Sequence, residues 1–333
     1  MMPLRPLLMP LVLVLGASPR SVRAAAGAHE ALAWRRADDP GADAGTCTLP
    51  RIDVGTTRGV AAFVGRHVRG ETPVVLTNLR GGEGEGETRA AFKEYLRRVS
   101  RRELLADFGE ATITLSTANS YSHAKIKKTL RAYVNDALDA AANAPRKVQD
   151  ARGNETYLWF GDHDDGDQAG QRLRRFIDTY EHAMPPAMRI PGTRFSRDVA
   201  LSFGIGGVGT GVPWHTHGAG FSECFSGRKR WFFQAPDDPP VWDPDATTAQ
   251  WLAAALRSER GVTWSECVVQ PGEAIYFPSE WYHATLNLDE TVHISAFVNG
   301  GAAATSARAA AARERGLQKI AQRRATQVTG ELR

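Results

Sequence analysis

Two stretches in the C-terminal third of the chain decide the fold: residues 209–223 read GTGVPWHTHGAGFSE, and residues 272–287 read GEAIYFPSEWYHATLN. Each places glycine and proline beside short apolar runs, a pattern typical of the strands and turns of a β-barrel. The first stretch contains His215 and His217, and the second contains His283. Imidazoles brought together from two separate strand pairs form a first coordination shell for a metal ion.

The spacing of the first two histidines suits joint binding of one ion. Residues two apart on a strand point to the same face, so His215 and His217 would project together from Cα atoms about 6.6 Å apart. A turn follows, and Glu223 on the returning strand is a candidate fourth ligand. A single histidine in a strand is more often a hydrogen-bonded structural residue, so it is the addition of His283 that favours a metal. Three imidazoles and at most one carboxylate would leave coordination positions open, as catalysis at a metal requires.

The other histidines lack partners at comparable spacing. They are interpreted as surface or packing residues: His29, His67, His123, His163, His182 and His293. The metal hypothesis therefore rests on three of the nine histidines in the chain.

Lys229 is the second informative position. In the run RKRWFF that begins at Arg228, alternation places Lys229 on the face of Trp231 and Phe233, two large apolar groups that should point inward. A buried ammonium is costly without an anion. We therefore expect Lys229 to hold the distal carboxylate of a small dicarboxylate cosubstrate. The alternative is that Lys229 faces solvent while Arg228 and Arg230 point inward.

The remaining periodicity predicts an α+β chain with a mainly β core. Upstream, helices are predicted over residues 59–68, 90–108, 128–141 and 171–182, and strands over residues 73–79, 112–117 and 155–160, with a loop over residues 81–87. Downstream, strands are predicted over residues 200–205, 212–217, 221–225, 229–234, 267–270, 273–277, 283–288 and 291–298, with a helix over residues 247–258. Many short strands separated by turns favour a jelly roll or small barrel, with the earlier helices packed on its outside.

The composition divides the chain into five parts. Residues 1–26 combine Arg5, an apolar run and small residues, as in a cleavable secretory signal; a disordered or transit-type N-terminus is the alternative. The apolar run is shorter than the roughly 20 residues of a transmembrane helix, and no later segment is long enough either. Residues 27–46 are expected to be flexible, residues 47–198 to form an α/β extension, residues 199–300 to form the barrel, and residues 301–333 to form a basic Ala/Arg-rich tail.

Two features agree with a secretory address. Asn154 begins an Asn-Glu-Thr glycosylation sequon. Three cysteines in an oxidising compartment allow one intramolecular disulfide, and the spacing alone does not choose the pair. Cys224 lies in an apolar strand and is interpreted as a buried thiol, so the expected pair is Cys47 with Cys267.

The charge distribution argues against a nucleic-acid partner. The formal net charge is +4. The excess of basic residues lies in the leader and in the tail after residue 300, so the body between them is acidic overall. The electrostatic footprint of nucleic-acid binding is therefore absent from the part of the chain expected to fold.

Several motifs in order resemble one known family. GRKRW from Gly227, YFP from Tyr276 and WYHATLNLD from Trp281 are similar to a JmjC domain of the small cupin-like hydroxylase type, and in particular to the JmjC domain-containing protein 8 family. The resemblance extends upstream through SFGI from Ser202 and WFGD from Trp159 and covers most of residues 47–298.

The resemblance implies a fold, cofactors and an address. The fold would be a double-stranded β-helix with flanking helices. The cofactors would be Fe(II) and 2-oxoglutarate, with the 2-oxoglutarate held through its distal carboxylate by Lys229 and with Asn287 beside it. The partner would be a protein substrate, and the location would be the secretory pathway, with the endoplasmic reticulum lumen as first choice and secretion as second.

The chain departs from the family pattern at two positions. Active JmjC oxygenases carry a carboxylate where this chain has His217, and a threonine often found three residues before the first ligand is Val212 here. An imidazole in place of a carboxylate makes the metal complex one unit more positive, unless Glu223 coordinates. Three hypotheses follow: an Fe(II)/2-oxoglutarate protein hydroxylase, a non-catalytic JmjC-like module that binds a partner protein, and a cupin that uses another divalent metal such as manganese, zinc or nickel.

Overall fold

The computed structural model describes residues 33–37, 47–82, 85–117, 125–138, 157–189, 199–243, 246–257 and 263–298. The strands are β1 Arg51–Asp53, β2 Val74–Thr77, β3 Thr112–Thr117, β4 Lys125–Thr129, β5 Tyr157–His163, β6 Val199–Gly206, β7 Gly220–Ser226, β8 Lys229–Gln234, β9 Ser265–Val269, β10 Ala274–Phe277, β11 Tyr282–Asn287 and β12 Thr291–Val298. The helices are α2 Thr57–Ala62, α3 Gly86–Arg98, α4 Arg101–Phe108, α5 Leu130–Ala132, α7 Gln168–Asp178, α8 Tyr180–Ala183 and α9 Thr248–Arg257. Two π-helical turns, Phe63–Val68 and Tyr133–Leu138, continue α2 and α5, and a 3-10 turn occupies Pro186–Met188.

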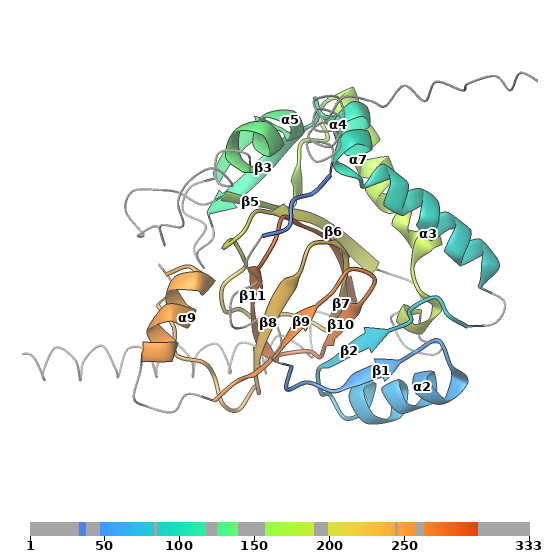
Figure 1. Ribbon diagram of the computed structural model, residues 1–333, viewed down its shortest axis with the longest axis vertical. Helices are drawn as coiled ribbons and strands as arrows, with labels where there is room; N and C mark the ends of the chain where they lie inside the picture. The colour runs from blue at the N-terminus through green and yellow to red at the C-terminus, as the bar shows by residue number, and fades with distance from the viewer. Residues whose placement is uncertain are drawn as a thin grey trace, which may run out of the picture.

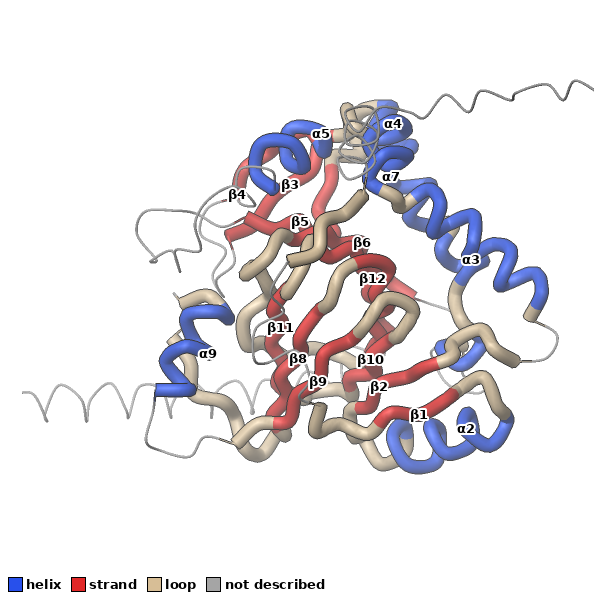
Figure 2. The backbone as a smooth tube through the Cα atoms, viewed as in Figure 1, coloured by secondary structure: helices blue, strands red, loops and turns tan. Residues whose placement is uncertain are grey.

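The strands form two sheets that face each other (Figures 1 and 2). The larger sheet has nine strands in the order β1-β2-β10-β7-β12-β6-β5-β3-β4, and the smaller has three in the order β11-β8-β9. Neighbouring strands are antiparallel except for the parallel pair of β1 and β2. The fold is a double-stranded β-helix of the jelly-roll type, as the sequence predicts.

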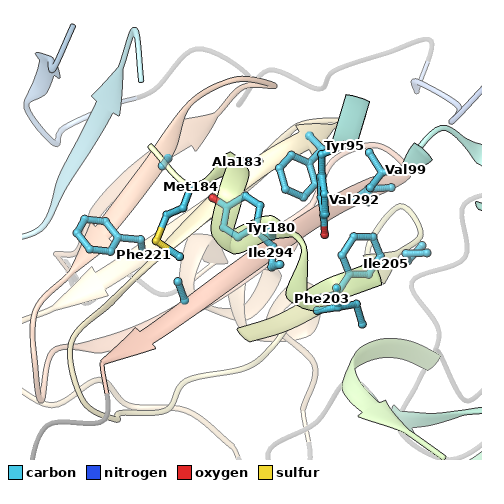
Figure 3. Packing of buried hydrophobic residues seen from close by; sticks show 14 of the residues in the cluster. Tyr95, Val99, Tyr180, Ala183, Met184, Phe203, Ile205, Phe221, Val292 and Ile294 are labelled. Carbon is cyan, nitrogen blue, oxygen red and sulfur yellow. The ribbon is translucent and has the colours of Figure 1, made fainter. Parts of the chain in front are cut away.

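Helices cover the outer face of the large sheet. Figure 3 shows this layer, in which Tyr95 of α3 and Tyr180 of α8 pack over Phe203 of β6. The ring of Tyr95 also stacks on Phe176 of α7, with ring centroids 4.9 Å apart. Aromatic groups of this size contribute most of the apolar area removed from water, at about 25 cal/mol per Å².

A second apolar layer lies between the two sheets, and a third covers the small sheet. In the second layer, Trp231 and Phe233 of β8 pack with Ile275 and Phe277 of β10. In the third, Trp251 of α9 packs against the outward-facing side of the small sheet, and α9 lies on the opposite side of the molecule from α3 and α7 (Figure 1). The candidate site residues therefore sit on a scaffold braced on both faces.

Three of the differences between the predicted and the observed elements have a clear local cause. Residues 212–217 are not a strand: one isolated bridge joins His215 to His283, because Pro213 has no N–H to donate to a ladder. The helix predicted over residues 90–108 is two helices, since Ser100 caps α4 by accepting a hydrogen bond from the Glu103 N–H at 3.4 Å. The helix predicted from residue 128 starts at residue 130, because β4 pairs with β3 first.

Part of the segment predicted to be flexible, residues 27–46, is held in place. The backbone N–H of Arg35 donates to Glu290 Oε2 at 2.8 Å, and that of Ala37 donates to Asp289 Oδ1 at 2.8 Å. Both acceptors lie at the turn between β11 and β12. Residues 33–37 are therefore part of the folded body.

The predicted disulfide is confirmed: Cys47 and Cys267 are joined, and Cys224 is a buried free thiol. The bridge connects the start of the folded body to β9. Among the described residues, none of the helices combines the length and the apolar character needed to cross a membrane. The predicted leader, the sequon at Asn154 and the basic tail lie outside the described residues.

Candidate metal centre

Three histidines converge, as the sequence predicts. One ring nitrogen from each of His215, His217 and His283 lies within 4.8 Å of the others, and the Nε2 atoms of His217 and His283 are 3.1 Å apart. The backbone N–H groups of His215 and His283 each donate to the other's carbonyl at 3.0 Å. This reciprocal pair of hydrogen bonds aligns the irregular segment before β7 with the start of strand β11 and sets the positions of the rings.

Each of the three rings is oriented by a backbone carbonyl. The Nδ1 atoms lie 2.7 Å from Pro213 O, 2.7 Å from Gly218 O and 2.9 Å from Trp281 O. A carbonyl only accepts, so each Nδ1 carries the proton and each Nε2 presents a lone pair. Metal-binding histidines are held in this way by partners outside the coordination shell.

Burial keeps the three imidazoles neutral, which is the form that binds metal. Desolvation first, and then the neighbouring His217, lower the pKa of His215 to about 3. Desolvation is also the first cause of the lowered pKa of His217 and of the pKa of His283, which falls well below its usual value.

The three rings open into a cavity between the sheets. Its empty space is about 280 Å³, which includes space open to solvent, and it is lined by Phe160, Val212, His215, His217, Lys229, Trp231, Phe277, His283, Thr285, His293, Ser295 and Phe297. No carboxylate belongs to this lining within the described part of the chain. The aromatic rings stand close to the histidines, with the ring centroids of His217 and Phe297 4.9 Å apart.

Glu223 does not join the histidines, contrary to the expectation that it supplies a fourth ligand. Arg80 donates to both of its carboxylate oxygens, at 2.6 and 2.8 Å, and the Tyr180 hydroxyl donates to one of them at 2.5 Å. The reason is the alternation of β7: Glu223 shares a face with Phe221 and Phe225, which pack in the helix-covered layer. Its carboxylate therefore lies on the other side of the sheet from the cavity.

Lys229 points inward, which excludes the alternative that it faces solvent. Its ammonium donates to Asn287 Oδ1 at 3.1 Å, and Asn287 Nδ2 donates to Thr210 Oγ1 at 2.9 Å. Burial lowers the pKa of Lys229 to about 7. Arg228 and Arg230 point to the opposite face, where they pair with Asp289 at 2.7 Å and with Glu266 at 2.8 Å.

The sequence reasoning missed several lining residues, among them His293 and Thr285. His293 was interpreted as a surface or packing residue, and Thr285 was not singled out, yet both line the cavity. The signal was available in alternation, since His293, Ser295 and Phe297 are spaced by two along β12 and share its inner face.

The residues present fit a divalent metal ion. Two nitrogens that each lie about 2.1 Å from one ion at a right angle are about 3.0 Å apart. The separation of 3.1 Å between the Nε2 atoms of His217 and His283 agrees with that value. Neutral imidazoles suit iron, zinc, copper and nickel.

Comparison with known proteins identifies the class and then the family. No family model matches the chain. Proteins named JmjC domain-containing protein 8 from Rattus norvegicus and Homo sapiens are 42% and 40% identical to it over 200 and 203 residues, which is 60% of this chain and 68% and 69% of theirs. A protein of Arabidopsis thaliana named arginine-specific demethylase JMJ20 is 31% identical over 101 residues, which is 27% of this chain and 22% of that protein. The jelly roll and its histidine-lined cavity define a JmjC-type protein. The chain belongs to the JmjC domain-containing protein 8 family.

Proposed function

We propose that this chain is an Fe(II)- and 2-oxoglutarate-dependent hydroxylase that acts on a protein side chain in the secretory pathway. The observation that carries the proposal is one cavity with three neutral imidazoles at one place and the buried ammonium of Lys229 at another. Members of the JmjC family use Fe(II) and 2-oxoglutarate. Arabidopsis relatives with shorter matches are named as arginine- and lysine-specific demethylases, which act on protein side chains.

The residues take separate roles in this proposal. His215, His217 and His283 would hold the iron through Nε2. Bound Fe(II) supplies O2 activation coupled to the oxidative decarboxylation of 2-oxoglutarate. Lys229 pairs with the distal carboxylate, Asn287 holds the ammonium in position, and the aromatic walls exclude water from the charged groups.

The charge of the cavity supports an anionic cosubstrate. A divalent ion on three neutral imidazoles keeps two positive charges, and protonated Lys229 adds a third. Because no described lining residue is a carboxylate, a dianion such as 2-oxoglutarate would supply the missing negative charge.

His217 favours a second function, that of a non-catalytic module that binds a partner protein. Oxygenases with a facial triad hold iron with two histidines and one carboxylate. Here the third position is an imidazole, and Glu223 is engaged by Arg80 instead of restoring the charge. In this alternative the cavity is only a part of the fold, and no reaction takes place in it.

The secretory address is supported by three features. The leader over residues 1–26 has the composition of a secretory signal, and Asn154 begins a sequon. The disulfide between Cys47 and Cys267 is the third, since structural disulfides persist in oxidising compartments. Cell fractionation tests the address. The mature protein should be recovered in the lumenal fraction, and glycosidase treatment should lower its apparent mass.

One experiment separates the two functions. The purified full chain is analysed for metal, loaded anaerobically with Fe(II), and assayed for succinate formed from 2-oxoglutarate, in parallel with the His217→Asp and Lys229→Ala variants. The hydroxylase reading expects turnover by the natural protein and its loss in Lys229→Ala, with partial rescue by excess 2-oxoglutarate. Succinate formation by His217→Asp alone would instead establish that the natural protein is a binding module.

A further inference from the structure

The inner face of the small sheet runs from the metal end of the cavity to its opposite end. β11 and β8 pair in register, with His283 opposite Phe233, Thr285 opposite Trp231 and Asn287 opposite Lys229. Four residues along a strand correspond to about 13 Å. The ammonium of Lys229 therefore emerges at the end of the cavity farthest from His283.

The inner face of β12 follows the same order on the facing sheet. Phe297 lies at the metal end, because its ring contacts that of His217 at 4.9 Å. His293 is four residues earlier on the strand and so lies toward the other end. The side chains of Lys229 and His293 thus face the same end of the cavity from opposite sheets.

The imidazole of His293 is buried without a partner for its Nδ1. The residue is 3% exposed, and Nδ1 makes no hydrogen bond to any residue that the structure describes. The ring stacks on Phe160 with centroids 5.7 Å apart and lies over Gly204, where an added Cβ would come within 2.4 Å of it. Leaving a buried polar atom without a hydrogen bond is unfavourable. Packing alone would be served equally well by a phenyl ring, so the nitrogens indicate a ligand.

Two further donors line the cavity and bond to no carboxylate among the described residues: Lys229 at this end, and Thr285 one step nearer the metal end. The ammonium of Lys229 has three protons, and its one hydrogen bond is to the amide oxygen of Asn287. Thr285 Oγ1 accepts from the Val212 N–H at 2.9 Å, which leaves its hydroxyl proton for a further acceptor. Both residues are almost fully buried.

We propose that His293 is a further binding residue of the subsite in which Lys229 would hold one carboxylate group of a small dicarboxylate, with the Thr285 hydroxyl beside them. A ring N–H of His293 donates to one carboxylate oxygen, while the ammonium of Lys229 and the hydroxyl of Thr285 donate to the other side of the group. The identity of the dicarboxylate as 2-oxoglutarate rests on the proposed function. The subsite itself rests on the donors and on the lack of a carboxylate among the described lining residues.

The test is calorimetric titration of 2-oxoglutarate and of succinate into the full chain, with no metal added and with Mn(II). Four variants are compared with the natural protein: His293→Phe, His293→Gln, Gly204→Ala and His67→Phe. We expect His293→Phe to weaken binding about tenfold or more, since a hydrogen bond to a charged group is lost. His293→Gln keeps a donor and should stay within about threefold, and Gly204→Ala should weaken binding by displacing the ring. His67 is a buried histidine outside the cavity lining, so its replacement should leave binding unchanged.

Two outcomes overturn the subsite: equal affinity in His293→Phe and the natural protein, or no binding of either dicarboxylate by the natural protein. Where His293→Phe does not fold, Gly204→Ala decides in its place, and so does the response of the His293 imidazole resonances to succinate in the unmodified protein. Binding that depends on His293 without any turnover would sustain the subsite and remove the hydroxylase function. Turnover combined with a dicarboxylate affinity that does not depend on His293 would sustain the hydroxylase function and remove the subsite.

Discussion

His217 and His283 meet with their Nε2 atoms 3.1 Å apart, while the Nδ1 atom of each lies within hydrogen-bonding distance of a backbone carbonyl. Since each carbonyl accepts a hydrogen bond from an Nδ1–H group, the Nε2 lone pairs of the two rings face each other in a buried site. This arrangement is unfavourable unless a cation or a shared proton lies between the rings. The fold therefore holds the two nitrogens in position for a cation before one binds.

We expect His283→Ala to remove the metal. His283 bridges to His215 through its backbone and faces His217 through its ring, so its loss takes away the central ligand. Metal content per chain, measured by mass spectrometry after dialysis against trace Fe(II) or Zn(II), should fall at least tenfold. His182→Ala, at an exposed position on α8, is the matched control. Full metal content in His283→Ala would remove these residues from consideration as a shell.

We expect carboxylate binding to weaken as the pH rises above 7. Burial lowers the pKa of Lys229 from 10.5 to about 7, so in the unliganded protein its ammonium loses its proton above that pH. The neighbouring Cys224 thiol, with a pKa raised to about 12, does not titrate in this range. The dissociation constant of 2-oxoglutarate should rise by up to about tenfold per pH unit between pH 7.5 and 9, with proton uptake seen as a buffer-dependent heat. A flat profile would show that Lys229 is not the anchor.

The same shift makes a prediction for stability. A lysine whose pKa is lower in the folded than in the unfolded state penalises folding below its folded pKa, and the penalty is relieved as the pH rises from about 7 to 10.5. Lys229→Met should therefore stabilise the unliganded protein at pH 6.5 and lose that advantage by pH 10. Chemical denaturation at both pH values measures the difference. An equal change in unfolding free energy at the two pH values would contradict it.

Glu223→Gln should cost stability and leave metal binding intact. Arg80 is buried, and breaking a buried ion pair from one side costs about 3–5 kcal/mol because the remaining charge has no counterion. Thermal unfolding and metal content are measured on the same sample. Glu94→Gln, which breaks an exposed pair with Arg97, is the control and should change little. Metal loss in a folded Glu223→Gln protein would return this carboxylate to the candidate ligands.

Cys47→Ser should destabilise the protein by about 2–4 kcal/mol, since the bridge it removes closes a long loop with a sequence separation of 220. Reductant should lower the unfolding midpoint of the natural protein to that of the variant and have no further effect on the variant. If the unfolding midpoint of the natural protein does not change even when thiol labelling shows that the disulfide has been reduced, the bridge contributes nothing to stability.

Local rules accounted for much of the site. Alternation along β8 placed Lys229 with Trp231 inside the barrel, and the spacing of the histidines indicated their convergence. Both follow from the period of two in a strand, which is a property of the chain itself. The same rule, applied to β12, would have placed His293 in the cavity.

What the sequence could not show depends on partners far away in the chain. Glu223 was expected beside the histidines because its position after a turn resembled that of a ligand. After the turn, however, the alternation of β7 directs Glu223 to the helix-covered face of the sheet, away from the cavity. Arg80 then meets the carboxylate from a segment 143 positions away. Pro213, by contrast, was a local signal: a proline cannot donate to a ladder, and the strand predicted over residues 212–217 did not take this into account.

The disulfide has a consequence for biosynthesis. Cys47 leaves the ribosome 220 residues ahead of Cys267, and β2 leaves long before β10, the strand that covers its second edge. A nascent chain that ends before the barrel closes has an unpaired Cys47 thiol and an unpaired edge of β2, and both can form non-native contacts. The bridge can therefore form only after residue 267 has been translated, and chains shortened to end before Cys267 are expected to be unstable instead of folding as smaller domains.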